Sequence, residues 1–448
     1  MTQRYDRAFD LSVHGERVIL MLPLNALMAA RIQGTIEPGE LRSAVESLRR
    51  RHALLAVRLV FEDDGAARYE AAGVGEIPVR VIDAVDSNSW LRAVRQELMT
   101  SFPIEEGPLV RFVLVRSPSH SGLVVAGHHA ICDGISLTFL IRDVLEMLTN
   151  AGRQPEVLPL PPPIDHATVP DPPGTRLLER WLVGLLNRKW RKQGISFDQG
   201  DMERLHEKFW RRNGEPMVLA WDLAESATAA LVERCRQEQV TINTALWTAF
   251  LAAQYHVQGD SEAFRSQAGM AVSTRDRLSV PVGDVLGFYA SSLTAELKHE
   301  PGASFWDGAR RIHGAILRAL ESADLFRMLT AEALHPTLLD SLYFAKYGLI
   351  TSRMSSRLLS KMRWRGTSYG FSITNVGRVD IPTQYGSRTI ESVYGPFVYS
   401  DVNEKVVGVT TVGGRMTFSL VCNAEAVGAD VAMSIRDSTM ARLEEAVR

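Results

Sequence analysis

The chain has 448 residues, of which 46% are apolar and 23% charged, close to the values of soluble globular proteins and far from those of disordered or fibrous chains. Its 50 Lys and Arg residues nearly balance 52 Asp and Glu residues, so no global field draws it to nucleic acid or to an anionic membrane. The three cysteines are few and widely spaced, which is typical of a reducing compartment, and no apolar run reaches the roughly 20 residues that span a bilayer. We therefore expect a soluble, cytoplasmic protein.

The first half combines helical and strand periodicities. Leu41, Ala44, Val45 and Leu48 recur at the spacing of an amphipathic helix over residues 39–52. Strands are predicted over residues 54–61, 77–82, 109–115 and 123–126, the last two joined by a turn-rich segment as a long hairpin. These elements predict an α/β fold with a mixed sheet.

A proline-rich segment separates the two halves. Residues 158–174 contain seven prolines, too many for a helix or a central strand, so we expect an extended connector there. We place the domain boundary in it, with one subdomain over residues 1–165 and a second over residues 166–448. In the second half we expect helices over 224–237, 241–253 and 305–323, strands over 269–272, 285–293 and 371–374, and a closing hairpin over 406–423.

One motif stands well above background, GHHAICDGIS at residues 127–136, between an apolar strand and a helical segment. If the strand continues through the pair, His128 and His129 point to opposite faces, so one acts on a substrate and the other supports it. Asp133 falls in a turn where a carboxylate can cap the helix or accept an arginine, and Gly134 lets the chain turn sharply.

Histidine at the end of a strand is well suited to take a proton from an alcohol or amine that attacks a carbonyl. A bare His-His pair is more often structural. The Asp-Gly pair at a fixed distance, on a strand-turn-helix frame, favours the functional interpretation.

The four residues His128, His129, Asp133 and Gly134 match the HHxxxDG signature, and the chain resembles the chloramphenicol-acetyltransferase-like superfamily. That superfamily includes nonribosomal peptide condensation domains, polyketide-associated acyltransferases and alcohol acetyltransferases. Residues 41–55 resemble its early helix, and residues 269–293 resemble its strand, arginine and Gly-Phe segment, in the same order.

The resemblance implies two α/β subdomains in a pseudo-dimer with an active-site tunnel between them, the thioester donor entering from one face and the acceptor from the other. His129 would be the general base and His128 mainly structural. Asp133 would pair with an arginine, for which Arg275 is the first candidate and Arg58 the second. An unpaired buried carboxylate would cost several kcal/mol, which also calls for such a partner.

The sequence departs from the family in two places. Ser291 stands where condensation domains usually have Asn, and the Asp-Phe-Gly-Trp-Gly segment of the plant enzymes is replaced by SITNVGR at residues 372–378. Ser291, Ser372 and Asn375 are candidates for contacts with the acceptor or the oxyanion, and purely structural roles for them stay open.

Two motifs point to other chemistries. GTSYG at residues 366–370 fits the nucleophile elbow of serine hydrolases, but a helix is expected before it and a strand after it, and the last histidine, His335, precedes Ser368. Gly73-Val74-Gly75 begins like a dinucleotide loop but leads into a strand. A metal site at the histidine pair is disfavoured because adjacent strand residues diverge. No metal or redox cofactor is expected.

Residues 176–192 combine a broad apolar face, which includes Trp181, Leu182 and Leu185, with a basic end. This pattern suits a membrane surface or an acidic acyl-carrier protein. The alternative is a linker helix packed on the second domain.

We therefore expect a stand-alone acyltransferase that moves an acyl group from a coenzyme A or carrier-protein thioester to an alcohol, or secondarily an amine, in lipid or natural-product biosynthesis. The thioester is a co-substrate, and no nucleic acid or membrane span is expected. The competing class is a catalytically silent condensation-like module that recruits carrier proteins. Because such relatives often lose one histidine of the pair, the presence of both favours a working enzyme.

Overall fold

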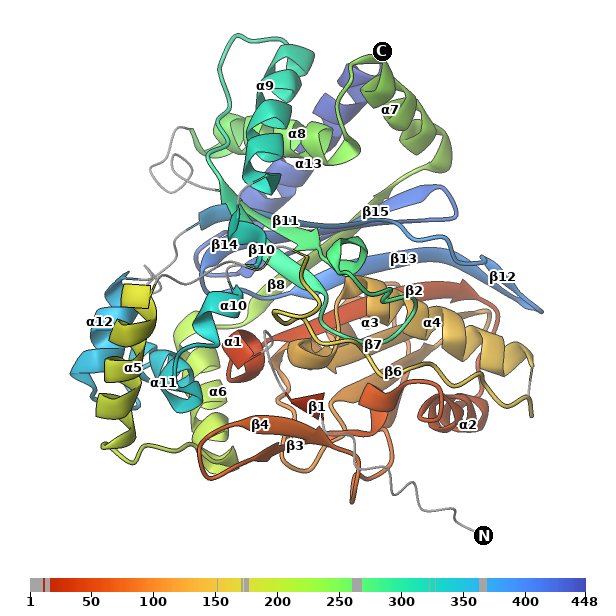
Figure 1. Cartoon of the computed structure of the whole chain (residues 1–448). Coiled ribbons are helices and arrows are strands. Elements are labelled where there is room, and N and C mark those ends of the chain that lie inside the picture. The colour runs from red at the N-terminus through yellow and green to blue at the C-terminus, as the bar shows by residue number, and fades with distance from the viewer. Residues whose placement is uncertain are drawn as a thin grey trace.

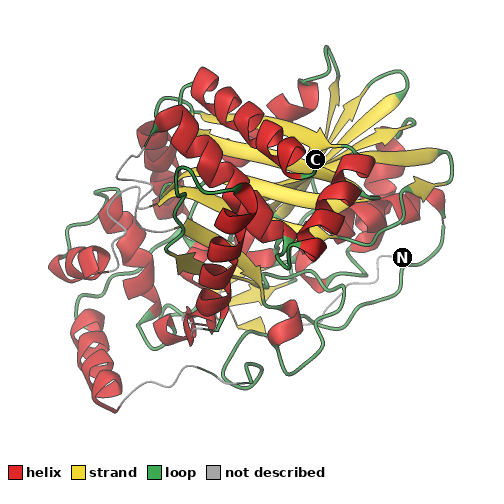
Figure 2. Cartoon of the chain, turned by 90° about the horizontal axis from the view of Figure 1, so that it is seen from above, coloured by secondary structure: helices red, strands yellow, loops and turns green. Residues whose placement is uncertain are grey.

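The structure is a computed structural model, and it describes residues 11–12, 17–150, 152–170, 172, 177–259, 268–321, 323–326, 328–361 and 369–448. In these residues the chain forms two six-stranded mixed sheets and a small three-stranded sheet. Figure 1 shows the two large sheets one above the other, and Figure 2 shows helices on both sides of the strands. The predicted α/β class is confirmed.

The first large sheet carries the histidine pair. Its strands lie in the order β12 (Gln384–Tyr385), β13 (Arg388–Val398), β2 (Asn25–Gln33), β7 (His120–His128), β6 (Val110–Arg116) and β5 (Val79–Asp83). Only β5 and β6 pair in parallel; the other neighbours are antiparallel. The predicted hairpin of β6 and β7 is confirmed. The central strand β2 is buried from Asn25 to Ala30, as expected for a strand covered on both faces.

The second large sheet comes from the second half of the chain. Its order is β10 (Ala290–Ala295), β9 (Ala268–Ser273), β11 (Tyr369–Arg378), β14 (Asn403–Val412), β15 (Arg415–Asn423) and β8 (Pro216–Leu223). Strands β14 and β15 form the predicted closing hairpin, in which Gly413 and Gly414 adopt φ values of 57° and 83° that favour glycine. The predicted strand over residues 285–293 begins only at Ala290, because the residues before it fold as a loop.

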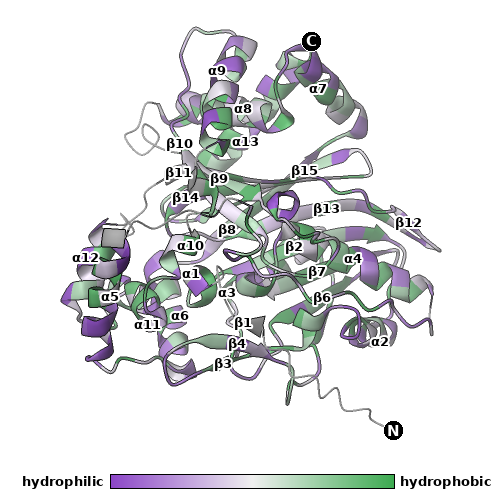
Figure 3. Cartoon of the chain, viewed as in Figure 1, coloured by the Kyte–Doolittle hydropathy of each residue, from purple (hydrophilic) through white to green (hydrophobic). Residues whose placement is uncertain are grey.

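Helices cover the outer faces of both sheets. Figure 1 shows α7, α8, α9 and α13 above the second sheet, and Figure 3 shows that strands in both sheets are largely apolar. The predicted helices are present as α2, α7, α8 and α9, and Thr241, whose Oγ1 accepts the Thr244 N–H at 3.2 Å, caps α8. The helices are α1 (Arg17–Leu20), α2 (Pro38–Leu48), α3 (Ser89–Met99), α4 (Gly134–Thr149), α5 (Leu177–Arg191), α6 (Gln199–Asn213), α7 (Glu225–Gln237), α8 (Ile242–Gln258), α9 (Phe305–Leu320), α10 (Met328–Ala331), α11 (Pro336–Lys346), α12 (Arg353–Lys361) and α13 (Ala429–Ala446). None of the described helices meets the length and hydropathy needed to cross a bilayer.

The expected strand over residues 54–61 is shorter than predicted. A 3₁₀ turn, η1 (Ala53–Ala56), occupies its first part and buries Leu54 and Leu55, and β3 (Arg58–Phe61) follows. This strand pairs with β4 (Ala67–Glu70), which also pairs with β1 (Leu11–Ser12), to give the small sheet. Successive buried side chains are compatible with either a short strand or a turn, and the pattern alone did not separate them.

Strand β13 connects the two halves of the molecule. It comes from the second half of the sequence but pairs with β2 in the first sheet, and its register is interrupted between Tyr394 and Phe397. At this interruption the second sheet lies close to β13. The Oγ of Ser419, on β15, donates to the Pro396 carbonyl at 2.9 Å. A Cβ on Gly408 would lie 2.1 Å from the same carbonyl oxygen, so only glycine fits there.

The proline-rich connector has no helix or strand over residues 152–170, as expected for an extended segment. The division into residues 1–165 and 166–448 stays a prediction. Strands β12 and β13 belong to the second half of the sequence but lie in the first sheet. A division into two contiguous segments therefore does not match the composition of the two sheets.

Candidate active site

The histidine pair lies where strand β7 ends. The strand stops at His128 rather than continuing, and a 3₁₀ turn, η2 (His129–Ile131), begins at the next residue. The two rings nevertheless have different surroundings: His128 packs edge-on to Phe102 of the first half, and His129 packs edge-on to Phe288 of the second half. The expected divergence is present, although a turn produces it and not the alternation of a strand.

The His129 ring is held by a backbone carbonyl. Its Nδ1 lies 2.8 Å from the oxygen of Cys132, and the ring centroid lies 5.1 Å from that of Phe288. Because a carbonyl oxygen can only accept, Nδ1 must carry the proton, which leaves Nε2 with a free lone pair in the neutral ring. The half-buried ring can therefore accept a proton at Nε2.

Burial keeps the His129 ring neutral. Desolvation lowers its pKa below the ordinary value of 6.5, and the Cys132 carbonyl and the Asp133 carboxylate raise the pKa by a smaller amount. A ring with this pKa direction is unprotonated near neutral pH. Both the tautomer and the charge state thus suit a general base.

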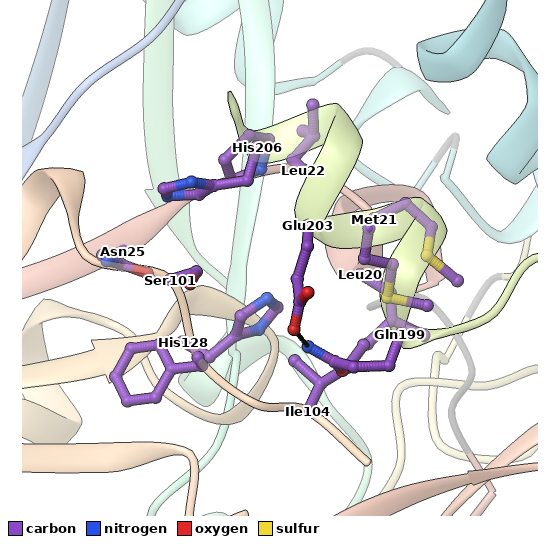
Figure 4. Close-up of a pocket in the computed structure, with 13 residues that line it drawn as sticks. Leu20, Met21, Leu22, Asn25, Ser101, Ile104, His128, Gln199, Glu203 and His206 are labelled. Atoms are coloured by element: carbon purple, nitrogen blue, oxygen red, sulfur yellow. Dashed lines mark hydrogen bonds between the residues drawn. The ribbon is translucent and has the colours of Figure 1, made fainter. Parts of the chain in front are cut away.

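His128 has a different environment. It is 5% exposed, its Nδ1 accepts the Ala130 N–H at 3.3 Å, and burial together with the neighbouring His129 and Arg111 lowers its pKa to about 3. The ring faces a cavity of about 40 Å³, across from Gln199 and Glu203 of α6 (Figure 4). His129 does not line this cavity, so the two rings do not share one space.

Asp133 connects the histidine turn to the second half of the chain. Its Oδ1 accepts the Ser136 N–H at 2.7 Å and caps α4, as the sequence predicts. The guanidinium of Arg275 donates to both carboxylate oxygens, at 3.2 and 3.3 Å, and the Tyr289 N–H donates to Oδ2 at 3.1 Å. The carboxylate is therefore fully engaged by structural partners.

Of the two arginines considered for Asp133, Arg275 is the one in contact. Arg58 instead forms an ion pair with Glu70 at 2.6 Å in the small sheet. Arg275 also donates to the Oγ of Ser136 at 2.6 Å and to the carbonyls of Gly283 and Val285. Together with the bond from Ser136 Oγ to the Gly287 carbonyl at 2.9 Å, these contacts fix the loop that carries Phe288.

Gly134 has a different role from the one the sequence predicted. Its φ is not in the left-handed region, so the turn itself does not require glycine. A Cβ at this position would lie 2.5 Å from Pro396 Cγ and 2.8 Å from Val376 Cγ2, on β13 and β11. Glycine is needed because two strands of the C-terminal half approach the start of α4 closely.

The other three candidates have local contacts. The Oγ of Ser291 donates to the Leu325 carbonyl, and the Asn375 side-chain oxygen accepts the Gly377 N–H at 2.8 Å across the bulge of β11. Ser372 is 9% exposed on the same strand, beside Gly269 of β9. In the described part of the chain, no hydrogen bond joins these three side chains to the His129 ring. Their proposed contacts with the acceptor or oxyanion stay predictions.

Two features of the site were not predicted. Neither Phe288, which lies in the Gly-Phe segment, nor Ser136 was expected to be a site residue, although both belong to the contacts around His129 and Asp133. The Cys132 carbonyl that orients His129 is a backbone group present in every residue, so the residue types could not predict this contact. The tunnel between the subdomains also stays a prediction.

The competing chemistries gain no support. Ser368 lies outside the described residues, but helix α12 before it and strand β11 after it have the reverse of the order that a nucleophile elbow needs. Over the described ranges, no group of three or more His, Cys, Asp or Glu side chains is arranged to hold a metal ion. The segment after Gly73-Val74-Gly75 leads into strand β5 and not into the helix of a dinucleotide site.

Comparison with known proteins identifies the architecture. Residues 24–169 match the family model described as Condensation domain. Phosphinothricin tripeptide synthetase PhsC of Streptomyces viridochromogenes is 27% identical over 326 residues, which are 69% of this chain and 29% of that protein. The chain thus spans less than a third of this relative.

Solved structures of the same architecture cover nearly the whole chain. The first condensation domain of the CDA synthetase superposes with a TM-score of 0.63 at 14% identity, over 99% of this chain and 96% of that one. The epimerization domain from the third module of tyrocidine synthetase B superposes with a TM-score of 0.62 at 16% identity, over 100% and 98%. At these identities the likeness establishes the fold, and the reaction has to be argued from the site.

Proposed function

Since the chain has the condensation-domain fold of the chloramphenicol-acetyltransferase-like superfamily, we propose that the protein transfers an acyl group from a thioester to the nitrogen or oxygen of an acceptor. His129 is the general base of this reaction. The similarity to peptide synthetases supports an amine acceptor and a carrier-protein donor. An alcohol acceptor and an acyl-coenzyme A donor are the alternatives, and the experiment described below compares them.

One observation carries the proposal: the 2.8 Å contact between His129 Nδ1 and the Cys132 carbonyl. It leaves Nε2 as the acceptor, and burial keeps the ring neutral. A base must be unprotonated and held in the right tautomer before the acceptor arrives, and the Cys132 contact and the burial of the ring support both conditions for His129.

The reaction then needs one proton acceptor and a positioned thioester. Nε2 of His129 takes the proton from the acceptor as its nitrogen or oxygen attacks the thioester carbonyl carbon. The tetrahedral intermediate collapses with cleavage of the carbon–sulfur bond, and the imidazolium returns the proton to the departing thiolate. Because the thioester is already activated, the protein mainly aligns two substrates and stabilises the oxyanion.

The remaining residues of the motif are positioning residues. Asp133 and Arg275 hold the start of α4 against the loop that carries Phe288, and Gly134 allows β13 and β11 to approach. Asn375 is our first candidate for the oxyanion, because its side-chain oxygen is occupied by Gly377 while its amide nitrogen has no partner among the hydrogen bonds of the described residues. Ser372 and Ser291 are further candidates.

The competing proposal is a silent module that recruits carrier proteins. Such a module does not require a histidine with an oriented, unprotonated nitrogen, so the His129 geometry supports a working site. The serine-hydrolase alternative is not supported, because the order of elements around Ser368 is reversed.

Intact-mass analysis tests the proposal. The purified chain is incubated with acyl-carrier-protein and acyl-coenzyme A donors, each combined with panels of amines and alcohols. We expect an acylated acceptor and free thiol in equal amounts with the unaltered chain, and loss by about 10² to 10⁴-fold with His129→Ala. A His129→Ala variant that retains full activity excludes His129 as the base. Carrier binding without turnover by any donor favours the silent module.

A further inference from the structure

Helix α5 exposes an apolar face. Trp181 is 60% exposed, Leu182 52% and Leu185 45%. Leu185 follows Trp181 at i+4 and Leu182 at i+3, so its side chain neighbours both of them on one side of the helix. Burial of such bulky apolar groups is normally favourable, so a contiguous exposed group of them is a characteristic of interaction surfaces.

The opposite face of α5 is firmly attached to the protein. Asn187 donates to the Ala333 carbonyl at 2.8 Å and accepts the His335 N–H at 2.9 Å. The indole of Trp190, which is 1% exposed, donates to Thr337 Oγ1 at 2.9 Å. The helix is thus packed through one face, as a linker helix would be, while the Trp181 face stays uncovered.

Basic residues continue the exposed apolar face toward the end of the helix. Arg188 and Lys189 follow Trp181 at i+7 and i+8, Lys192 lies in the turn directly after α5, and all three are exposed. Over the residues the structure describes, no ion pair is recorded for any of them. The balanced charge of the whole chain, -2, therefore conceals a local positive surface beside three exposed apolar side chains.

We propose that the Trp181 face of α5 docks this protein on the surface of an anionic lipid bilayer. Trp181, Leu182 and Leu185 enter the region between headgroups and acyl chains, and Arg188, Lys189 and Lys192 contact lipid phosphates. Aromatic and leucine side chains together with lysines and arginines are the composition of helices that lie in a membrane interface. A protein partner would need a cavity that fits three bulky side chains and a matching acidic surface, whereas a bilayer adapts to both.

This docking goes beyond acyl transfer, because it places the enzyme where lipid-soluble acyl donors or acceptors are concentrated. The affinity is modest, since few apolar groups enter the bilayer and each basic residue near the surface contributes about 1 kcal/mol, or roughly fivefold in binding. Increasing salt weakens the interaction.

Vesicle flotation with the full chain tests the docking. The protein is mixed with vesicles of phosphatidylcholine alone or of phosphatidylcholine and phosphatidylglycerol in equal parts. We expect binding to the mixed vesicles that falls about tenfold in a Trp181→Ala, Leu185→Ala double variant and about 25-fold in an Arg188→Gln, Lys189→Gln double variant. Leu317→Ala, which removes another 45% exposed leucine from α9, is the matched control and should bind like the unaltered chain.

The outcomes separate docking from catalysis. No binding to the mixed vesicles, or equal binding by all variants, overturns the proposal. Binding to an acidic acyl-carrier protein that depends on the same side chains, without binding to vesicles, overturns it in favour of a protein partner. All these positions are exposed and lie outside the His129 site, so acyl transfer with water-soluble substrates should continue in each variant, whichever result the flotation gives.

Discussion

Asp133 and Arg275 are 142 positions apart in the sequence, and their side chains meet at 3.2 Å in the interior of the protein. Asp133 caps the helix after the histidine turn, and Arg275 follows the second strand of the other large sheet, β9. The exposed fractions are 5% for Asp133 and 8% for Arg275. One ion pair thus joins the histidine turn to the opposite half of the molecule.

Asp133→Asn should lower stability and activity together. The substitution leaves the Arg275 guanidinium buried without its counter-charge, which typically destabilises by about 3–5 kcal/mol. The loop with Phe288 should then move away from His129. Chemical denaturation and a transfer assay on the same preparations measure both effects.

The matched control for Asp133→Asn is Arg58→Gln, which breaks the half-exposed pair with Glu70. It should change the unfolding free energy by less than about 1 kcal/mol and leave activity intact. Lost activity of Asp133→Asn at unchanged stability would contradict a structural role for Asp133.

The pH dependence of kcat/KM should report the His129 environment. Because burial lowers the His129 pKa below 6.5, the ring remains a free base at neutral pH, and kcat/KM should decline only as the pH falls through a value below 6.5. Phe288→Ala admits water beside the ring, which weakens the desolvation and should move the acid limb toward 6.5. An acid limb above 6.5 in the unaltered chain, or one that does not respond to Phe288→Ala, would argue against this account of the base.

Gly134→Ala should destabilise the protein. The added methyl group would lie within 2.8 Å of Val376 and 2.5 Å of Pro396, and overpacking of this kind typically costs about 1–3 kcal/mol. Gly39→Ala in the first turn of α2 is the control: nothing lies within 4 Å of its added Cβ, so helix propensity should leave stability equal or slightly higher. Equal unfolding midpoints for the two variants would show that the close approach at Gly134 relaxes freely.

His128 should make the fold less stable in acid. Its pKa is about 3 in the folded chain against 6.5 for an exposed ring, so the unfolded chain binds the proton first. The contribution of neutral His128 to the free energy of unfolding is fully present above pH 6.5. It is lost as the pH falls from 6.5 toward 3, by up to about 1.4 kcal/mol per pH unit.

Urea denaturation at neutral and mildly acidic pH measures this slope. A His128→Asn variant, which cannot take up the proton, should lose less stability on acidification than the unaltered chain. His52 and His129, whose pKa values burial also lowers, retain their own contributions in the variant. The same loss in both proteins would mean that His128 does not titrate on unfolding.

The sequence predicted the elements that depend on local patterns. The buried positions Leu41, Ala44, Val45 and Leu48 of α2 follow from helical spacing, and the hairpin at Gly413-Gly414 follows from turn chemistry. The histidine motif was found because its residue types and spacing are specific. The pairing of Asp133 with Arg275 came from family resemblance and agrees with the observed contact.

What could not be predicted depends on distant parts of the chain. The loop before Ala290 has the apolar residues of a buried strand. Its backbone carbonyls, however, accept hydrogen bonds from the Arg275 and Ser136 side chains and not from a neighbouring strand. No residue pattern announces that the Cys132 carbonyl orients His129. Helices α1, α3, α6, α10, α11 and α13 were not predicted.

Because β13 lies in the first sheet, this sheet cannot be completed until most of the second half of the chain has been synthesised. Strand β2 obtains one of its two neighbours only when residues as late as Val398 have left the ribosome. Until then, or in a fragment cut at the proline-rich connector, an apolar strand next to the histidine turn presents an open hydrogen-bonding edge to other chains. We therefore expect the N-terminal half, expressed alone, to be prone to aggregation through this edge.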